Sequence, residues 1–170
     1  MKITLAQLNY IIGDFDGNTA KIITAIKEAK SRGVDLVVFS ELCVCGYPPL
    51  DLLEHKYFVN KSLEKVDEIA SVCTGISAIV GAPELNRKSN GKNLYNSAFF
   101  LNDGKTEQVV KKTLLPTYDV FDEYRYFESN TGSGGSSLDR DTVMVFADSV
   151  VKSSNHIIPS GRPPHLCIPK

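Results

Sequence analysis

The run Val34-Asp35-Leu36-Val37-Val38-Phe39 constrains the fold most, because its side chains are almost all apolar. A strand buried on both faces has this pattern, whereas a strand with one face in water alternates. An alternating segment precedes it at residues 2–8, and residues 19–32 between the two carry apolar side chains at helical spacing, with Asn18 or Thr19 as a cap. The order of strand, helix and buried strand predicts a layered α/β fold.

The later segments continue this alternation. Residues 57–73 have the apolar spacing of a second helix, and residues 76–82 read as another buried strand. Residues 94–101 and 106–110 form a predicted hairpin about the turn Asn102-Asp103-Gly104. We therefore expect one sheet with helices packed on it.

Charge excludes several classes of protein. The 170 residues contain 19 Lys and Arg against 20 Asp and Glu, a formal net charge of -1, which argues against a nucleic-acid binder and against a polybasic membrane-surface protein. No apolar run reaches the ~18 residues that a membrane span needs, and no secretory signal is recognisable. We expect a cytoplasmic protein without a membrane partner, whose four cysteines are reduced.

Composition changes after Glu128. Residues 129–170 contain half of the eight prolines and the run Gly132-Ser133-Gly134-Gly135-Ser136-Ser137. Such a run is typical of a flexible linker. A phosphate-binding loop is the alternative, but it needs a strand before it and a helix after it, and neither is evident. We divide the chain into residues 1–128 and a tail of residues 129–170 of unknown origin.

Two charged residues follow predicted strands. Glu41 comes just after residues 34–39, and open α/β sheets place their sites at the carboxyl ends of strands. A carboxylate in apolar surroundings can act as a general base, and Lys112, after the second hairpin strand, could stabilise an oxyanion. The alternatives are a solvated glutamate at a strand end and a surface lysine beside Lys111.

An aromatic and charged stretch follows Lys112, and could wall the pocket of a small polar substrate or simply pack on itself. It contains Tyr118, Phe121, Glu123, Arg125 and Tyr126. Cys43 and Cys45 lack the neighbours of a zinc site, and we interpret them as small buried side chains that point the same way from an extended segment.

Four stretches together resemble one family: ITLAQLNYIIGDFDGN, DLVVFSELCVCGYPPLDLL, IVGAPE and KKTLLPTYDVFDEYRYFE. Residues 1–128 resemble the N-terminal half of the nitrilase-type carbon–nitrogen hydrolase domain, and most closely the glutamine amidohydrolase domain of glutamine-dependent NAD+ synthetases. The resemblance implies an αββα sandwich of four layers, of which this chain supplies the N-terminal portion. We further expect part of the sheet surface to be uncovered and the chain to form homo-oligomers.

The family uses a Glu–Lys–Cys triad. By resemblance, Glu41 is the general base, Lys112 stabilises the oxyanion, and Tyr118 and Glu123 shape the pocket for the amide substrate, L-glutamine. The glutaminase chemistry needs no cofactor and no metal, whereas ATP and Mg²⁺ belong to a synthetase domain that is absent from this chain and is its expected partner.

The family's nucleophile has no recognisable counterpart. Cys167 is the sole cysteine after the aromatic stretch, and prolines flank it instead of a Cys-Glu-Asp context. The sequence predicts an ammonia-supplying glutaminase domain of NAD+ synthetase that is truncated and inactive as given. Two alternatives stay open: a carbon–nitrogen hydrolase acting on another small amide, and a non-catalytic fragment that only assembles.

Overall fold

A computed structural model describes residues 1–88, 91–117 and 122–130, so the tail of residues 129–170 lies almost entirely outside the described part. Its elements, in chain order, are β1 (Ile3–Ala6), α1 (Phe15–Ser31), β2 (Leu36–Phe39), η1 (Leu50–Glu54), α2 (Lys56–Val72), β3 (Ser77–Leu85), β4 (Leu94–Asn102), β5 (Lys105–Lys111) and α3 (Glu123–Tyr126). The predicted α/β fold is confirmed.

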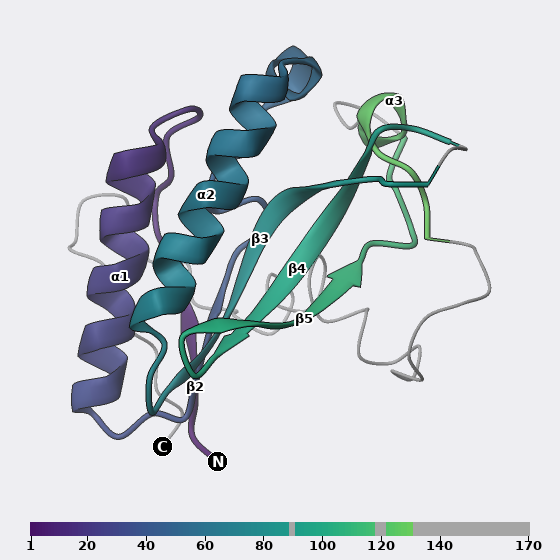
Figure 1. Ribbon diagram of the computed structural model, residues 1–170. Coiled ribbons are helices and arrows are strands. Elements are labelled where there is room, and N and C mark those ends of the chain that lie inside the picture. Colours follow the sequence, from purple (N-terminus) through teal and green to yellow (C-terminus); the bar gives the residue numbers. More distant parts are fainter. Residues whose placement is uncertain (89–90, 118–121, 131–170) are drawn as a thin grey trace.

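The strands form one five-stranded sheet in the order β1-β2-β3-β4-β5. β1, β2 and β3 are parallel, while β4 is antiparallel to both β3 and β5. α1 and α2 lie side by side on one face of this sheet (Figure 1). One helical layer on one sheet is half of the expected four-layer sandwich.

The hairpin of β4 and β5 turns at Asp103 and Gly104, as predicted, and both have positive φ angles of 48° and 81°. The pairing shifts by one residue near the turn. Phe100 pairs with Gln108 but Leu101 pairs with Thr106, so Glu107 has no partner across the ladder and forms a bulge.

α1 begins earlier than the sequence predicted. Its N-cap is Asp14, whose side chain accepts a hydrogen bond from the Gly17 N–H at 3.0 Å. Asn18 lies inside the helix, fully buried, where its side chain bonds to the Ile11 backbone and to the Val44 carbonyl. The expected cap at Asn18 or Thr19 is wrong because Asn18 ties the helix to two loops instead.

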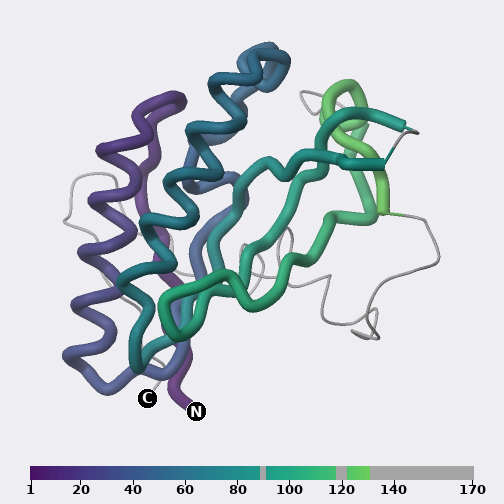
Figure 2. Tube along the Cα trace, viewed as in Figure 1, coloured from purple at the N-terminus to yellow at the C-terminus, as the bar shows by residue number. Residues whose placement is uncertain are grey.

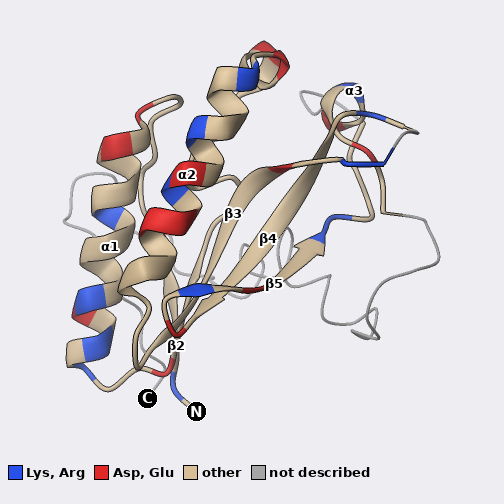
Figure 3. Cartoon of the chain, viewed as in Figure 1, with Lys and Arg blue, Asp and Glu red and all other residues tan. Residues whose placement is uncertain are grey.

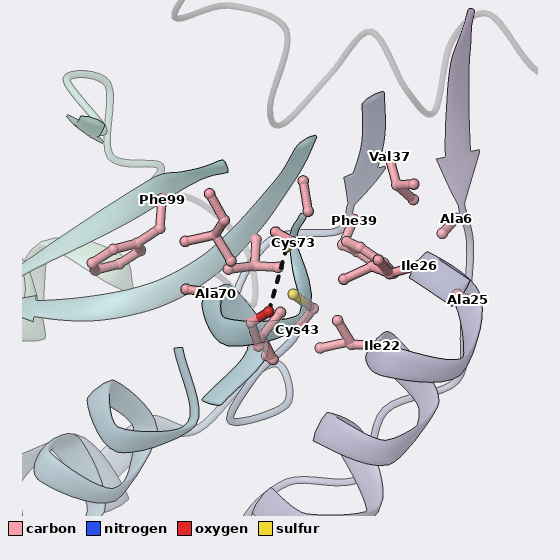
Figure 4. Close-up of a cluster of buried hydrophobic side chains, with 14 of the residues drawn as sticks. Ala6, Ile22, Ala25, Ile26, Val37, Phe39, Cys43, Ala70, Cys73 and Phe99 are labelled. Carbon is pink, nitrogen blue, oxygen red and sulfur yellow. Dashed lines mark hydrogen bonds between the residues drawn. The ribbon is translucent and has the colours of Figure 1, made fainter. Parts of the chain in front are cut away.

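The main core lies between the helices and the sheet (Figure 4). It contains Ile22 and Ile26 of α1, Ile69 of α2, and Val37 and Val80 of the sheet, all nearly inaccessible. On the opposite face of the sheet the side chains are only half-buried: Leu5, Val38, Ile79 and Phe100. The expectation that β2 is buried on both faces is therefore met fully only on the side of the helices.

The buried state of Cys43 and Cys45 is confirmed, but their common direction is wrong. Cys43 lies in the main core, and Cys45 belongs to a second apolar cluster with Phe15 and Leu53. Residues 41–45 form a turn rather than an extended strand, and Leu42 within it has a positive φ of 47°. The two thiols consequently point into different clusters.

Charged residues are frequent along α1 and α2, whereas in the sheet they are mostly on β5 (Figure 3). The ends of β3 and β4 that flank the loop between them lie near α3 (Figure 2), and there the Glu128 N–H donates to the Leu94 carbonyl at 2.7 Å. No helix in the described ranges has the length and apolar character needed to cross a membrane.

Candidate active site

Strand direction brings Glu41 and Lys112 to the same edge of the sheet. β4 runs opposite to β3, and β5 runs opposite to β4, so β5 has the same direction as β2. Glu41 follows β2 within two residues and Lys112 follows β5 directly. Carboxyl ends of strands with one direction meet at one edge, which is where open α/β sheets place their sites.

The Lys112 ammonium joins two carboxylates. Its Nζ donates to Glu41 Oε1 at 2.7 Å and to both oxygens of Glu123, at 3.0 and 2.8 Å. The side chain of Lys112 is 17% exposed, that of Glu41 22% and that of Glu123 7%. A partly buried cluster of one cation and two anions leaves one uncompensated negative charge.

Two further polar groups complete the cluster. Asn96 on β4 donates through its side-chain amide to Glu41 Oε1 at 2.5 Å, and the Tyr47 hydroxyl lies 3.4 Å from Glu123 Oε1. Neither residue was predicted as part of a site, because a single asparagine in a strand and a tyrosine in a turn carry no pattern of their own. The one signal for Asn96 was a polar residue in an otherwise buried strand.

The surroundings shift the pKa values of the cluster. Burial raises the pKa of Glu123, and the nearby charge of Glu41 raises it further, against the opposing effect of Lys112. Burial alone would lower the pKa of Lys112, but Glu41 and Glu123 outweigh it, so the pKa of Lys112 is raised and the amine stays protonated. Burial, followed by Glu123, also raises the pKa of Tyr47.

α3 fixes the position of Glu123, its first residue. Arg125 forms an ion pair with Asp51 of η1 at 3.1 Å, and the Tyr126 hydroxyl donates to the same carboxylate at 2.5 Å. Phe127, just after the helix, is buried in the second apolar cluster. Arg125 and Tyr126 therefore anchor the short helix to η1.

The structure thus brings Glu41, Lys112 and Glu123 together. Arg125 and Tyr126 contact η1 instead of joining the cluster. Tyr118 and Phe121 lie outside the described residues, as do Cys167 and the Gly/Ser run. Over the described ranges, no group of three or more His, Cys, Asp or Glu side chains could hold a metal ion.

The fold and this cluster define a class. The chain belongs to the carbon–nitrogen hydrolase family, whose model matches residues 2–160. An amidase from Nesterenkonia sp. is 20% identical with a TM-score of 0.64 over 78% of this chain and 49% of its own, which shows that the fold is shared. The matched range passes residue 128, and the division of the chain at that point stays a prediction.

Within the family, the chain is similar to glutamine-dependent NAD+ synthetases. The protein of that name from Synechocystis sp. is 45% identical over 131 residues, which are 75% of this chain and 24% of the relative. The structure of the Acinetobacter baumannii synthetase, solved with ADP, is 38% identical with a TM-score of 0.69, and the match covers 77% of this chain and 24% of that one. This chain spans about a quarter of the length of the curated relatives that it matches.

Proposed function

We propose that residues 1–128 are the N-terminal part of an ammonia-supplying glutamine amidohydrolase domain of an NAD+ synthetase. The contact of Lys112 with both Glu41 and Glu123 carries this proposal, because it joins a base and a fixed cation at one strand edge. The 45% identity to the Synechocystis synthetase supports the branch. L-glutamine is the proposed substrate.

Each side chain has a role in the proposed reaction. Glu41 takes the proton of a cysteine thiol as its sulfur attacks the glutamine carboxamide, and the Lys112 ammonium stabilises the tetrahedral oxyanion. Glu41 returns the proton to the leaving ammonia, and then activates water to hydrolyse the thioester to glutamate. Glu123 holds Lys112 in place and, with Tyr118, lines the pocket.

The nucleophile belongs to sequence that this chain does not recognisably contain, and we propose that the 170-residue chain is inactive by itself. We propose that ATP and Mg²⁺ act in a synthetase domain outside this chain, in line with the ADP bound in the Acinetobacter baumannii structure. That domain is the proposed partner in a cytoplasmic homo-oligomer.

The test extends residues 1–128 with the sequence that follows the matched segment in the Synechocystis relative and measures ammonia release. We expect L-glutamine to be hydrolysed, with kcat lowered about 10²–10⁴-fold in Glu41→Gln and about 10²–10³-fold in Lys112→Met. Lys111→Met is the matched control and should keep full activity. Full activity in Glu41→Gln would contradict the assigned base.

Two arms separate the alternatives. A preference for acetamide or another small amide over L-glutamine would favour a different branch of the family. The unextended chain should release no ammonia, and activity that disappears in Cys167→Ala would overturn the proposed inactivity.

A further inference from the structure

The turn that carries Glu41 leaves the sheet before β3 ends. β2 pairs with β3 only as far as Val38 opposite Ile79, whereas β3 continues to Leu85. The backbone groups of β3 beyond Ile79 that face β2 are buried and need other partners. Gly81 lies in this part of β3, beyond the last pair with β2, and is itself buried.

The turn supplies those partners through Cys43 and Val44. The Gly81 N–H donates to Cys43 Sγ at 3.4 Å, and the Gly81 carbonyl accepts from the Val44 N–H at 3.3 Å, with the Cys43 thiol 3.7 Å from the same oxygen. Cys43 is inaccessible to solvent, and burial raises its pKa to about 12. The Gly81 N–H therefore bonds to a thiol that is neutral at physiological pH.

Gly81 also supports the Glu41 peptide directly. A Cβ at this position would lie 2.5 Å from the Leu42 nitrogen and 3.1 Å from the Glu41 carbonyl carbon. Real Cβ atoms do not approach backbone this closely, so a side chain at residue 81 would displace the turn. The positive φ of Leu42, 47°, bends the chain over this contact.

We propose that Cys43 and Gly81 are positioning residues that fix the turn after β2 and so set where the Glu41 carboxylate meets Asn96 and Lys112. Neither residue touches the substrate, and both act through the Glu41 backbone. This proposal rests on the proposed function, because it assigns the two residues to the base of that reaction.

Two NMR measurements on the 170-residue chain without substrate test the proposal. The first is the titration of the Glu123 carboxyl, because Glu41 raises the pKa of Glu123. If Cys43→Ala moves Glu41 away, this pKa falls. The second is amide hydrogen exchange at Gly81, which we expect to be about tenfold faster after loss of one hydrogen bond, with Ala78 of the same strand as the internal reference.

Cys73→Ala is the matched control. Cys73 is equally buried in the same core (Figure 4), but its thiol donates to the Ile69 carbonyl of α2, away from the turn. This variant should leave the Glu123 titration and the ratio of exchange at Gly81 and Ala78 unchanged. Cys43→Ser keeps an acceptor for the Gly81 N–H and should restore both readouts towards wild type.

An unchanged Glu123 titration in Cys43→Ala would overturn the proposal. Equal acceleration of amide hydrogen exchange at Gly81 and Ala78 would also overturn it, because that result indicates a loss of global stability alone. Should alanine prevent folding, Cys43→Val removes the acceptor while filling the core, and the same outcomes decide. Because no turnover is measured, failure of this proposal is distinguishable from failure of glutamine hydrolysis in the extended chain.

Discussion

Replacing Lys112 with methionine should destabilise the fold by about 3 kcal/mol at pH 8, because removal of one partner of a buried ion pair leaves the others uncompensated. Here the uncompensated groups are two carboxylates that face each other, Glu41 and Glu123, which are 22% and 7% exposed. Methionine fills the space of the lysine stem, so the loss reports charge more than packing.

The loss should depend on pH with a definite sign. The pKa of Glu123 is raised in the folded state by burial and then by Glu41. A carboxyl of this kind contributes stability below its unfolded pKa, near 4.5, that is lost as pH rises through the folded pKa. The Lys112 ammonium lowers the pKa of Glu123, so its removal raises that pKa further. Lys112→Met should therefore cost little at pH 5 and the full amount at pH 8.

Urea unfolding followed by circular dichroism between pH 5 and pH 8 measures this effect. With an m-value of about 2 kcal/mol/M, the midpoint at pH 8 should fall by about 1.5 M. Lys111→Met is the control, since Lys111 is 27% exposed and pairs with one carboxylate, Glu84, at 3.3 Å, so its removal leaves no pair of carboxylates uncompensated. Adding Glu123→Gln to Lys112→Met should recover part of the loss at pH 8. Equal losses in the two lysine variants, or a loss independent of pH, would refute the reasoning.

Three further outcomes follow from the fold. Asp14→Ala should cost about 1 kcal/mol in urea unfolding through the lost N-cap of α1, and Asp14→Asn, which keeps an acceptor, should cost less. Gly46→Ala should destabilise by ~1–3 kcal/mol, because Gly46 has a φ of +83° and a Cβ there would lie 2.7 Å from the Ile12 backbone; an unchanged midpoint would contradict this contact. The thiols of Cys43, Cys45 and Cys73 should react with iodoacetamide at pH 8 only after unfolding, as mass spectrometry would show. Burial raises their pKa values to about 12, 12 and 11, respectively.

Periodicity was sufficient to predict most of the fold. The strand in the apolar run at residues 34–39 and the glycine turn at Asp103-Gly104 depend on local chemistry, and both are present, although the strand is fully buried on one face alone. The start of α1 could not be predicted in the same way. Asn18 and Asp14 are both good caps, and only the tertiary bonds of Asn18 to Ile11 and Val44 decide between them.

The residues of the candidate site also differ in whether local pattern or tertiary contacts determine their role. Glu41 and Lys112 could be predicted because they follow strands within a recognisable pattern. Asn96 could not, because its importance comes only from the position of Glu41 across the sheet. The placement of Cys43 and Cys45 in different clusters likewise follows from the turn at residues 41–45, which replaces the extended segment that the sequence suggested.

The bulge at Glu107 decides which of two adjacent lysines enters the site. Because of this extra residue, Ser97 pairs with Lys111, and the Lys112 N–H bonds to the Asn96 carbonyl. Cross-strand partners share a face of the sheet, and a shift of one residue exchanges the faces. If Glu107 instead paired with Phe100 in an unbroken ladder, Lys111 would lie opposite Asn96 and Lys112 would be sent to the other side, whereas deleting Glu107 removes the bulge and keeps Lys112 opposite Asn96. The identity of the cation is set by a bulge near the turn, several pairs away from the carboxylates that it serves.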